Sequence, residues 1–410
     1  MINKYYFVKG GAERYLFELT KILREKGHDV VPFAMKNERN YFSPYEEYFL
    51  NNIEFNLKSP IEKIINSYKI FSRVVYSRHA QKKLQSLIET SKPDIAHLHM
   101  IDHQISPSIL ITLKKANIPI IQTVHQYKMV CPNYRFYIEH KNKICEKCIN
   151  GKFYHAICEK CHKNSYAASI LVAFESYIHR FLKVYNHIDI FHVPSHFMGS
   201  KLKKAGVHEN KIRHQFYSIN MSEYLFNRDF GEYFIYFGRL SGEKGLHTLL
   251  QAMKKISNHS IHLYIVGDGP LRQELQVAAI RLGLSNVKFF GYQQKDELKS
   301  IVANARFTVV PSEWFENSPL VIYESFALGR PAIGSNVGGI PELVDDQVNG
   351  LLFEVGNADD LAEKIQWLYF QPEKIKEFGE NARRKAECYF SIENNYSKIL
   401  TFYHELLNTA

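Results

Sequence analysis

Two glutamates eight residues apart have the chemistry to hold a polyhydroxylated ligand. Glu316 and Glu324 lie in the segment Pro311–Glu324, directly after an apolar stretch. Ser318-Pro319 between them is typical of a helix start, with serine as N-cap and proline at the first helical position. A helix that begins there separates the carboxylates by roughly 9–10 Å, so each could hold one end of a ligand such as a sugar nucleotide. A capped helix with incidental glutamates is the alternative.

The same helix start is a candidate anion site. The first backbone N–H groups of a helix have no partner within it and attract phosphate, together with the helix dipole. Here these are the N–H groups of Ser318, Leu320 and Val321. We therefore expect the ligand to contact Asn317, Ser318, Pro319 and Leu320.

A glycine-rich loop, Gly238–Leu246, places two cations five residues apart. Glycines such as Gly238 let the backbone approach a ligand, and Arg239 with Lys244 matches the charge of a diphosphate. A leaving nucleoside diphosphate needs its charge neutralised by a metal or by cations, and no Asp-x-Asp metal pair stands out in the sequence. Arg239 and Lys244 are therefore the candidates, with an exposed polar turn as the alternative.

Further glycine turns follow other apolar stretches. Gly10 and Gly11 open the first helix, and Gly338–Glu342 opens a late one. Either turn could admit phosphate at a helix N-terminus. Gly267–Pro270 also ends a strand and is explained equally well as an ordinary turn.

Three histidines lie on or after strands of the first half. His125 ends a strand, where a side chain could contact a sugar or orient an acceptor, although a histidine there is more often structural. His97 and His99 are two residues apart and share one face of a strand, which is either core or cleft.

A group of cysteines has the spacing of a zinc site. Cys145, Cys148, Cys158 and Cys161 form two Cys-x2-Cys pairs, although the spacer between the pairs is short. Cys131 is a fifth candidate, and the spacing does not choose between it and Cys158. An all-sulfur site would be structural rather than catalytic, and free thiols in a small subdomain are the alternative.

The elements that position these residues are strands and helices in alternation. We expect strands at 95–99, 118–125, 188–194, 233–238, 261–266, 287–290, 307–310 and 331–334. Helices lie between them, for example Ala12–Lys26 and a second helix from a Ser106-Pro107 cap to Asn117. This alternation predicts parallel sheets with helices on both faces and ligands at the carboxyl ends of the strands.

The predicted fold class is α/β, with two doubly wound parallel-sheet domains that face a cleft. The length of 410 residues supports two domains. We expect the first at residues 1–217, with a cysteine-bearing insertion at about 130–165, and the second at 218–391. The last helix, 392–410, is expected to pack back on the first domain.

Charge is divided unevenly along the chain. The net charge is +10, but residues 1–220 contain 33 Lys and Arg against 18 Asp and Glu, so they carry about +15. A basic first half suits a phospholipid surface, a lipid-phosphate acceptor or a nucleic acid, or it serves solubility alone. The segment Ile61–Leu87 has six cations among apolar residues and is either a membrane-facing amphipathic surface or an ordinary solvated helix face.

The sequence contains no run of 18 apolar residues and no apolar core of a signal peptide. Its six cysteines in so long a chain do not suggest a disulfide scaffold. We therefore expect a cytoplasmic protein, peripheral at the inner face of the cell membrane.

Taken together, these motifs resemble the retaining glycosyltransferases of family 4, which have the GT-B fold of two Rossmann-like domains. The resemblance covers nearly the whole chain. It is carried by Gly10-Gly11, Thr123–His125, Val193–Ser195, Gly238–Leu240 with Lys244, Gly267–Pro270, the Glu316/Glu324 pair and Gly338–Glu342.

The resemblance implies a role for each main site residue. Glu316 would hold the transferred sugar and stabilise positive charge at its anomeric carbon, and Glu324 would bind the ribose. Arg239 and Lys244 would hold the diphosphate, and His125 would touch the sugar from the opposite domain. A hexosyltransferase of this kind would use a UDP- or GDP-sugar and a cell-envelope polysaccharide or glycolipid acceptor. It would need no catalytic metal, so a zinc ion would be structural.

One feature departs from the family pattern. Members usually begin with a full β-strand before the two glycines, but only Met1–Val8 precede Lys9-Gly10-Gly11. We expect the first strand to be largely absent, at a cost to stability and activity.

Two other functions stay as alternatives. A zinc-containing nucleic-acid-binding protein would explain the cysteines and the basic half, but it leaves the glycine loops and paired glutamates unexplained, so no nucleic-acid partner is expected. A sugar-nucleotide epimerase or a phosphorylase would share the same fold.

Overall fold

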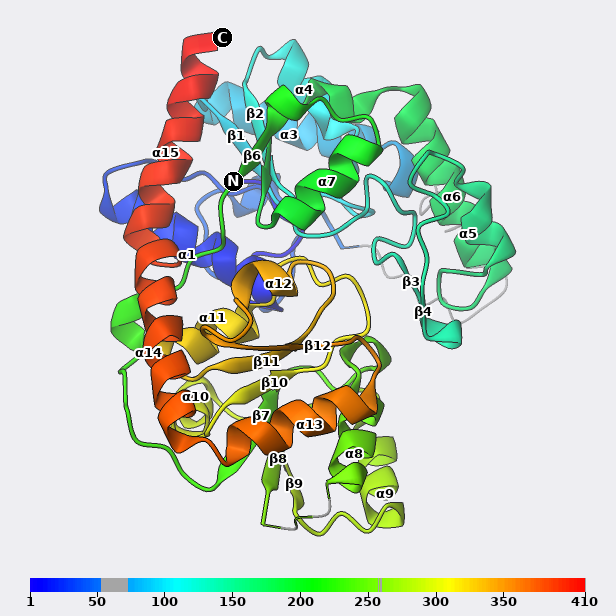
Figure 1. Ribbon diagram of the computed structural model, residues 1–410. Helices are drawn as coiled ribbons and strands as arrows, with labels where there is room; N and C mark the ends of the chain where they lie inside the picture. Colours follow the sequence, from blue (N-terminus) through cyan, green and yellow to red (C-terminus); the bar gives the residue numbers. More distant parts are fainter. Residues whose placement is uncertain (53–72, 257, 259, 410) are drawn as a thin grey trace. The chain divides into compact units, whose positions relative to one another are not determined.

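The computed structural model describes residues 1–52, 73–256, 258 and 260–409 (Figure 1). The chain divides into two compact units. Unit 1 comprises Met1–Phe136, Cys145–Gln215 and the chain from Asn395 on, and unit 2 comprises Tyr137–Ile144 and Phe216–Asn394.

Unit 1 is built on a four-stranded parallel sheet. Its order is β1 (Ala96–Leu98), β2 (Ile120–Thr123), β5 (Ile190–Val193) and β6 (Ile212–His214). The residues of the first three strands are buried throughout, as is typical of parallel strands that are covered on both faces. In register, Leu98 lies beside Gln122 and Thr123 beside His192, so the carboxyl ends of these strands meet at one edge.

The start of the chain lies next to β1. Ile2 pairs in parallel with Leu98 on one side and with Phe33 on the other. Its N–H donates to the carbonyl of His97 at 2.8 Å. As expected, no full strand precedes α1 within the described residues. Ile2 nevertheless makes isolated bridges in the position of a first strand, and the backbone groups of residues 1–4 are bonded to both neighbours.

The helices of the described part of unit 1 lie before, between and after its strands. They are α1 (Gly11–Glu25), α3 (Arg78–Ser91), α4 (Ile109–Lys115), α5 (Tyr154–Cys158), α6 (Tyr166–Phe181), α7 (His196–Lys204) and α15 (Ile392–Thr409), the last from Asn395 on. The predicted cap of α4 is wrong, because the helix begins two residues beyond Pro107. Ser106 has a φ of 74°, and its hydroxyl donates to the carbonyl of Val75 instead.

The predicted lipid-facing segment Ile61–Leu87 falls partly outside the described residues, which resume at position 73. Arg73 is only 7% exposed. Its guanidinium donates to the carbonyls of Gln104 at 2.6 Å and Asn51 at 2.9 Å. Arg73 is therefore a buried structural cation and not part of a membrane-facing surface.

A short hairpin lies inside the expected insertion. It is formed by β3 (Tyr137–Ile138) and β4 (Lys143–Ile144), which pair antiparallel. These residues belong to unit 2, whereas all of 130–165 was expected in the first domain. The side chain of Asn142 at the hairpin turn lies beside Gly242 of unit 2, which accounts for the difference.

Unit 2 has a six-stranded parallel sheet. Its order is β12 (Gly350–Phe353), β11 (Ala332–Ser335), β10 (Thr308–Val310), β7 (Tyr233–Phe237), β8 (His262–Val266) and β9 (Val287–Gly291). The core joins apolar side chains of these strands, such as Phe234 and Ile265, to Leu249 and Ile365 of two helices.

The helices of unit 2 are α8 (Leu246–Lys255), α9 (Arg272–Arg281), α10 (Lys295–Ala303), α11 (Leu320–Ala327), α12 (Ile340–Leu343), α13 (Ala358–Tyr369) and α14 (Pro372–Tyr389). α13 packs against α8, and α14 packs against α11 (Figure 1). Within the described residues, no helix has both the length and the hydropathy to cross a membrane.

Candidate functional site

Glu316 lies at the edge of the unit 2 sheet where the strands have their carboxyl ends. It forms an ion pair with Lys244. Its Oε1 accepts hydrogen bonds from Lys244 Nζ at 2.6 Å and from the hydroxyl of Ser312 at 2.7 Å. Ser312 and Glu316 follow β10, and Lys244 follows β7. Because these two strands are parallel neighbours, the loops that leave their carboxyl ends meet.

The charge of Glu316 is maintained by this environment. Burial favours the neutral acid, but the Lys244 ammonium and the hydrogen bonds from Lys244 and Ser312 outweigh it, so the pKa of Glu316 lies below its ordinary value. The side chain of Lys244 is 23% exposed, against 7% for Glu316. At neutral pH the site therefore presents an ionised carboxylate beside a cation that is partly open to ligand.

Two glycines allow the loops to approach so closely. Gly245 follows Lys244 with a φ of 66°, and a Cβ there would lie 1.8 Å from the carbonyl oxygen of Pro311. Gly338 has a φ of 63°, and a Cβ there would lie 2.3 Å from the carbonyl oxygen of Glu316. The N–H of Gly339 donates to that same oxygen at 2.8 Å. The predicted phosphate loop at Gly338 thus holds the backbone of Glu316 in place.

Glu324 lies in the first turns of α11 and is 8% exposed. Its Oε1 accepts a hydrogen bond from the hydroxyl of Tyr224 at 3.4 Å. Tyr224 is buried and precedes β7, and sequence reasoning missed it because no spacing links the two positions. Both predicted glutamates therefore lie in unit 2 on the segment that follows β10.

The predicted cap of α11 is wrong. The helix begins at Leu320, and Pro319 is the residue before it, with no side-chain cap. The hydroxyl of Ser318 instead bonds that of Tyr323. Asn317 and Ser318 are buried at the start of the helix, and the ligand role predicted for Asn317–Leu320 stays a prediction.

The other predicted cation, Arg239, has an exposed side chain directly after Gly238. Its carbonyl accepts a hydrogen bond from the hydroxyl of Tyr236 at 2.7 Å, which fixes the backbone of the loop. Arg239 and Lys244 thus leave the same strand end, one open to solvent and the other partly covered.

Histidines form a network at the strand ends of unit 1. His125 Nε2 lies 2.9 Å from His99 Nδ1, and the ring of His99 stacks on that of His97 at 4.6 Å. His97 Nε2 lies 2.7 Å from Thr123 Oγ1, which in turn lies 2.9 Å from His192 Nδ1. Sequence reasoning named His97, His99 and His125 but missed His192, which the register of β2 and β5 places beside Thr123.

These imidazoles are neutral at physiological pH. Burial, with the neighbouring His192, lowers the pKa of His125 to about 3. Burial lowers the pKa of His192 itself to about 4. The network therefore consists of neutral donors and acceptors and carries no positive charge.

Gly10 and Gly11 are exposed where α1 begins. Gly10 is the N-cap, and its extended backbone has a φ of −164°. Its carbonyl accepts the first helical hydrogen bond, from the N–H of Arg14 at 3.1 Å. The N-terminus of a long helix is therefore accessible at the position where the sequence predicts a phosphate contact.

Comparison with known proteins decides the family. The model for glycosyltransferase family 4 matches residues 9–214, and the model for glycosyl transferases group 1 matches residues 223–385. This chain belongs to glycosyltransferase family 4. The predicted resemblance is confirmed.

Relatives of this family 4 chain include biosynthetic enzymes. The chain is 26% identical to the N-acetyl-alpha-D-glucosaminyl L-malate synthase of Bacillus anthracis, over 97% of this chain and 94% of that protein. It is 33% identical to an uncharacterized glycosyltransferase of Methanocaldococcus jannaschii over 45% of this chain. The chain spans about half the length or less of the first curated relatives that it matches, at 51%, 37% and 30%.

Solved structures share the fold of the family 4 chain. Sucrose-phosphate synthase from Thermosynechococcus elongatus superposes with a TM-score of 0.72 at 19% identity, covering 100% of this chain and 98% of that one. Anabaena HepE in complex with UDP and glucose superposes with a TM-score of 0.67 at 17% identity, covering 99% and 98%. The fold is GT-B, with two Rossmann-like units, which confirms the predicted fold class.

Five of the six cysteines of the family 4 chain lie between residues 131 and 161, in the part of unit 1 that contains α5, and Cys388 lies on α14. Cys131 and Cys148 are buried, Cys145 and Cys161 are partly buried, and Cys158 is exposed. Burial and the nearby thiols of Cys131, Cys161 and Cys145 raise the pKa of Cys148. Among the described residues, no three of these sulfurs lie within 4.8 Å of one another. The structure therefore groups four thiols loosely and leaves Cys158 at the surface.

Proposed function

We propose that this chain transfers a sugar from a nucleotide-sugar donor to an acceptor hydroxyl, with retention at the anomeric carbon. The observation that carries the proposal is the buried, ionised Glu316, which is bonded to the partly exposed Lys244 at the carboxyl edge of the unit 2 sheet. An anionic group and a cation at this edge match the two charges of the reaction, a developing oxocarbenium ion and a leaving diphosphate.

In the proposed reaction, the bond between the anomeric carbon and the diphosphate oxygen breaks. The acceptor oxygen then forms its bond on the same face of the sugar. The acceptor proton passes to the leaving phosphate oxygen, so atoms and charge balance without an added base. Glu316 stabilises the positive sugar ring, and Lys244 with Arg239 takes up the charge of the diphosphate. These two cations would replace a catalytic metal.

The remaining site residues receive supporting roles. Glu324, close to the hydroxyl of Tyr224, would accept hydrogen bonds from the ribose hydroxyls. His125, neutral in its network, would contact the sugar. Exposed backbone groups at Gly10 and Gly11 would contact phosphate or sugar.

A UDP-sugar is the first donor to test, because HepE, which shares this fold, was crystallised with UDP and glucose. Relatives such as the O-antigen chain mannosyltransferase C of Escherichia coli support a cell-envelope glycan or glycolipid as acceptor. With such an acceptor, the enzyme would work in the cytoplasm at the inner face of the membrane.

Donor binding and turnover test the proposal together. UDP- and GDP-sugars are screened by thermal shift, and hits are then assayed for donor hydrolysis and for transfer to a glycan or lipid acceptor. Binding of at least one nucleotide sugar, and release of its nucleoside diphosphate, is expected. A folded protein that binds neither nucleotide class would refute the proposed function.

We further propose that the insertion binds one structural zinc through Cys131, Cys145, Cys148 and Cys161. Support comes from the burial of Cys131 and Cys148 and from the exposure of Cys158. Zinc–sulfur bonds of about 2.3 Å would draw the four sulfurs together. Elemental analysis should find stoichiometric zinc in the wild type and in Cys158→Ser, but not in Cys148→Ser. Zinc retained by Cys148→Ser would contradict this assignment.

A further inference from the structure

Helix α6 buries polar side chains and exposes large apolar ones. Its buried side carries Ser169, Glu175, Ser176 and His179 together with Val172 and Ala173. Its exposed side carries five large apolar residues at helical spacing: Tyr166, Ile170, Phe174, Tyr177 and Phe181, which are 55%, 51%, 43%, 40% and 82% exposed. Surface helices of globular proteins normally have the opposite arrangement.

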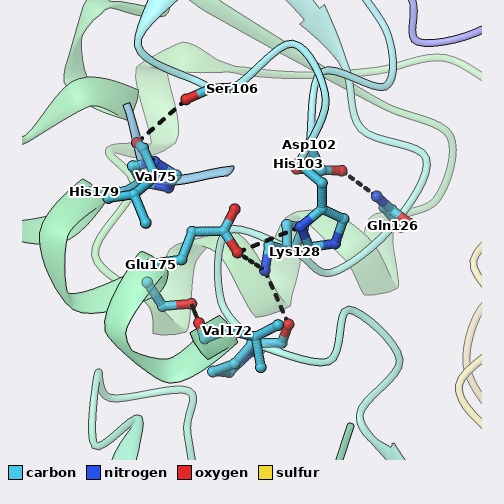
Figure 2. Close-up of polar contacts among 11 residues, drawn as sticks. Val75, Asp102, His103, Ser106, Gln126, Lys128, Val172, Glu175 and His179 are labelled. Atoms are coloured by element: carbon cyan, nitrogen blue, oxygen red, sulfur yellow. Dashed lines mark hydrogen bonds and ion pairs between the residues drawn. The ribbon is translucent and has the colours of Figure 1, made fainter. Parts of the chain in front are cut away.

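The buried polar side fixes this orientation (Figure 2). Glu175 Oε2 lies 2.7 Å from Lys128 Nζ and 3.5 Å from His103 Nδ1. His179 Nε2 lies 2.8 Å from the carbonyl oxygen of Val75. Rolling the helix to bury its aromatic side would break these contacts and leave Lys128 as an unpaired buried charge, which is costly. The apolar side is therefore held outward.

Neighbouring residues enlarge the exposed apolar surface. α5 packs beside α6, and Tyr154 of α5 is 48% exposed (Figure 1). Its backbone N–H donates to the hydroxyl of Tyr177 at 3.1 Å. We define the α6 patch as Tyr154, Tyr166, Ile170, Phe174, Tyr177 and Phe181. Soluble monomers rarely expose a continuous apolar surface of this kind unless it binds something.

The surroundings of the α6 patch are cationic. Residues 147–183 contain six Lys and Arg against two glutamates, of which Glu159 pairs with Lys147 and Glu175 is buried. Lys160 Nζ lies 4.4 Å from the ring centre of Tyr166. The patch therefore suits a partner that is apolar and negatively charged at once.

A cavity lies at the C-terminal end of the same helix. Its volume is about 600 Å³, and its lining includes Arg180, Lys183 and Lys211, together with Lys128, whose charge is paired with Glu175. Apolar side chains such as Phe153 and Phe191 also line it, and none of the described lining residues is acidic. A cavity with cationic and apolar walls is suited to the phosphate of a lipid headgroup.

We propose that the α6 patch docks this protein onto an anionic phospholipid bilayer. The aromatic side chains would enter the interface between headgroups and acyl chains, and the surrounding cations would contact lipid phosphates. This inference deepens the membrane side of the proposed function, and it concerns a surface other than the predicted segment Ile61–Leu87, which falls partly outside the described residues. It does not depend on sugar transfer.

Vesicle flotation without donor tests the inference separately from catalysis. Wild-type protein should float with vesicles of equimolar phosphatidylcholine and phosphatidylglycerol, but not with phosphatidylcholine alone. Phe174→Glu/Phe181→Glu should lower the affinity by at least about tenfold, because each phenylalanine loses its apolar burial. Arg180→Ala should lower it by about fivefold.

The matched control is Ile280→Glu, which changes a side chain that is 80% exposed on α9 of unit 2. It should bind vesicles like the wild type. A second readout places tryptophan in the patch. The emission of Phe181→Trp should be quenched by brominated anionic lipid, whereas the native Trp314 and Trp367, both of unit 2, should not respond.

Three results would overturn the inference. These are binding that ignores lipid charge, full vesicle binding by Phe174→Glu/Phe181→Glu, and dimerisation that depends on Phe181 without vesicle binding. The last would assign the patch to a second copy of the chain. Transfer activity on a water-soluble acceptor should be the same in wild type and patch variants, so failure here leaves the proposed reaction intact.

Discussion

Two lysine–glutamate pairs in this chain have nearly the same length and different surroundings. Lys244–Glu316 in unit 2 measures 2.6 Å, and Lys128–Glu175 in unit 1 measures 2.7 Å. The lysine side chain is 23% exposed in the first pair and 3% in the second. A ligand can therefore compete for Lys244, whereas Lys128 is committed to Glu175 and to the carbonyl of Pro132. The same ion pair is therefore available to a ligand in unit 2, as the proposed function requires, and closed to one in unit 1.

The largest expected effect is the loss of stability when the buried Lys128–Glu175 pair is broken. Glu175→Ala leaves Lys128 as an unpaired buried cation, so we expect a loss of about 3–5 kcal/mol in the free energy of unfolding. Denaturant unfolding followed by circular dichroism measures it. The double variant Lys128→Met/Glu175→Leu should recover much of the loss, since both charges are removed. If Glu175→Ala unfolds like the wild type, the pair has no structural role.

A change in the partly exposed Lys244–Glu316 pair should affect catalysis rather than stability. Glu316→Ala removes the carboxylate from the proposed sugar site, so transfer should fall by about 10²–10³-fold. Because Lys244 is partly exposed, its charge is solvated after the change, and the unfolding midpoint should stay close to that of the wild type. Initial rates with the best donor provide the measurement. Near-normal rates in a folded Glu316→Ala protein would exclude Glu316 from the reaction.

A fall in pH should destabilise unit 1 more than unit 2. His97, His99, His125 and His192 of unit 1 all have pKa values lowered by burial, to about 3 for His125 and about 4 for His192. In the unfolded chain their pKa is about 6.5, so below that pH the unfolded state binds protons that the folded state does not. Their stabilising contribution is complete above pH 6.5. It is lost as the pH falls, by up to about 1.4 kcal/mol per pH unit for each imidazole.

Hydrogen exchange at pH 7 and pH 5.5, corrected for intrinsic rates, measures this difference. Peptides from β1, β2 and β5 should lose protection more than peptides from β7 and β10. Glu316 has a lowered pKa, so its contribution is present above the unfolded carboxyl value near 4.3 and is lost only at more acidic pH. Equal loss in both units would show that the histidine network does not control the acid response.

The smallest expected effect is on the affinity for the diphosphate of the nucleotide. Lys244→Ala should weaken UDP binding by about tenfold, the effect of losing one charged hydrogen bond. The double variant Lys128→Met/Glu175→Leu, which removes the buried pair without leaving an unpaired charge, should leave the UDP affinity unchanged. Isothermal titration gives both values. UDP binding that is insensitive to Lys244→Ala would assign the diphosphate to Arg239 or to backbone groups.

The main strands and glycine loops could be predicted because their signals are local. Apolar runs that end in glycine or serine mark the carboxyl ends of parallel strands, and this locates Glu316 and Lys244 before any contact is known. The roles of these residues in donor binding stay predictions. Caps were less predictable, since Ser318 and Ser106 find hydroxyl and carbonyl partners that the sequence does not indicate.

Long-range pairs could not be predicted at all. Lys128 and Glu175 are 47 residues apart, and Tyr224 and Glu324 are 100 apart. No periodicity links such positions, so only the folded chain shows that they meet. The buried polar side of α6 was missed for the same reason. The spacing of residues along the helix does not show that Lys128, 47 residues before Glu175, pairs with it.

Trp314 gives the site an optical property of its own. Its ring centre lies 5.3 Å from Lys244 Nζ, and the chain contains only one other tryptophan, Trp367 on α13. A cation close to an indole ring alters the emission of that ring, so a ligand that draws the ammonium away changes the signal. Occupancy of the site can therefore be followed by intrinsic fluorescence, in real time and with unlabelled donors.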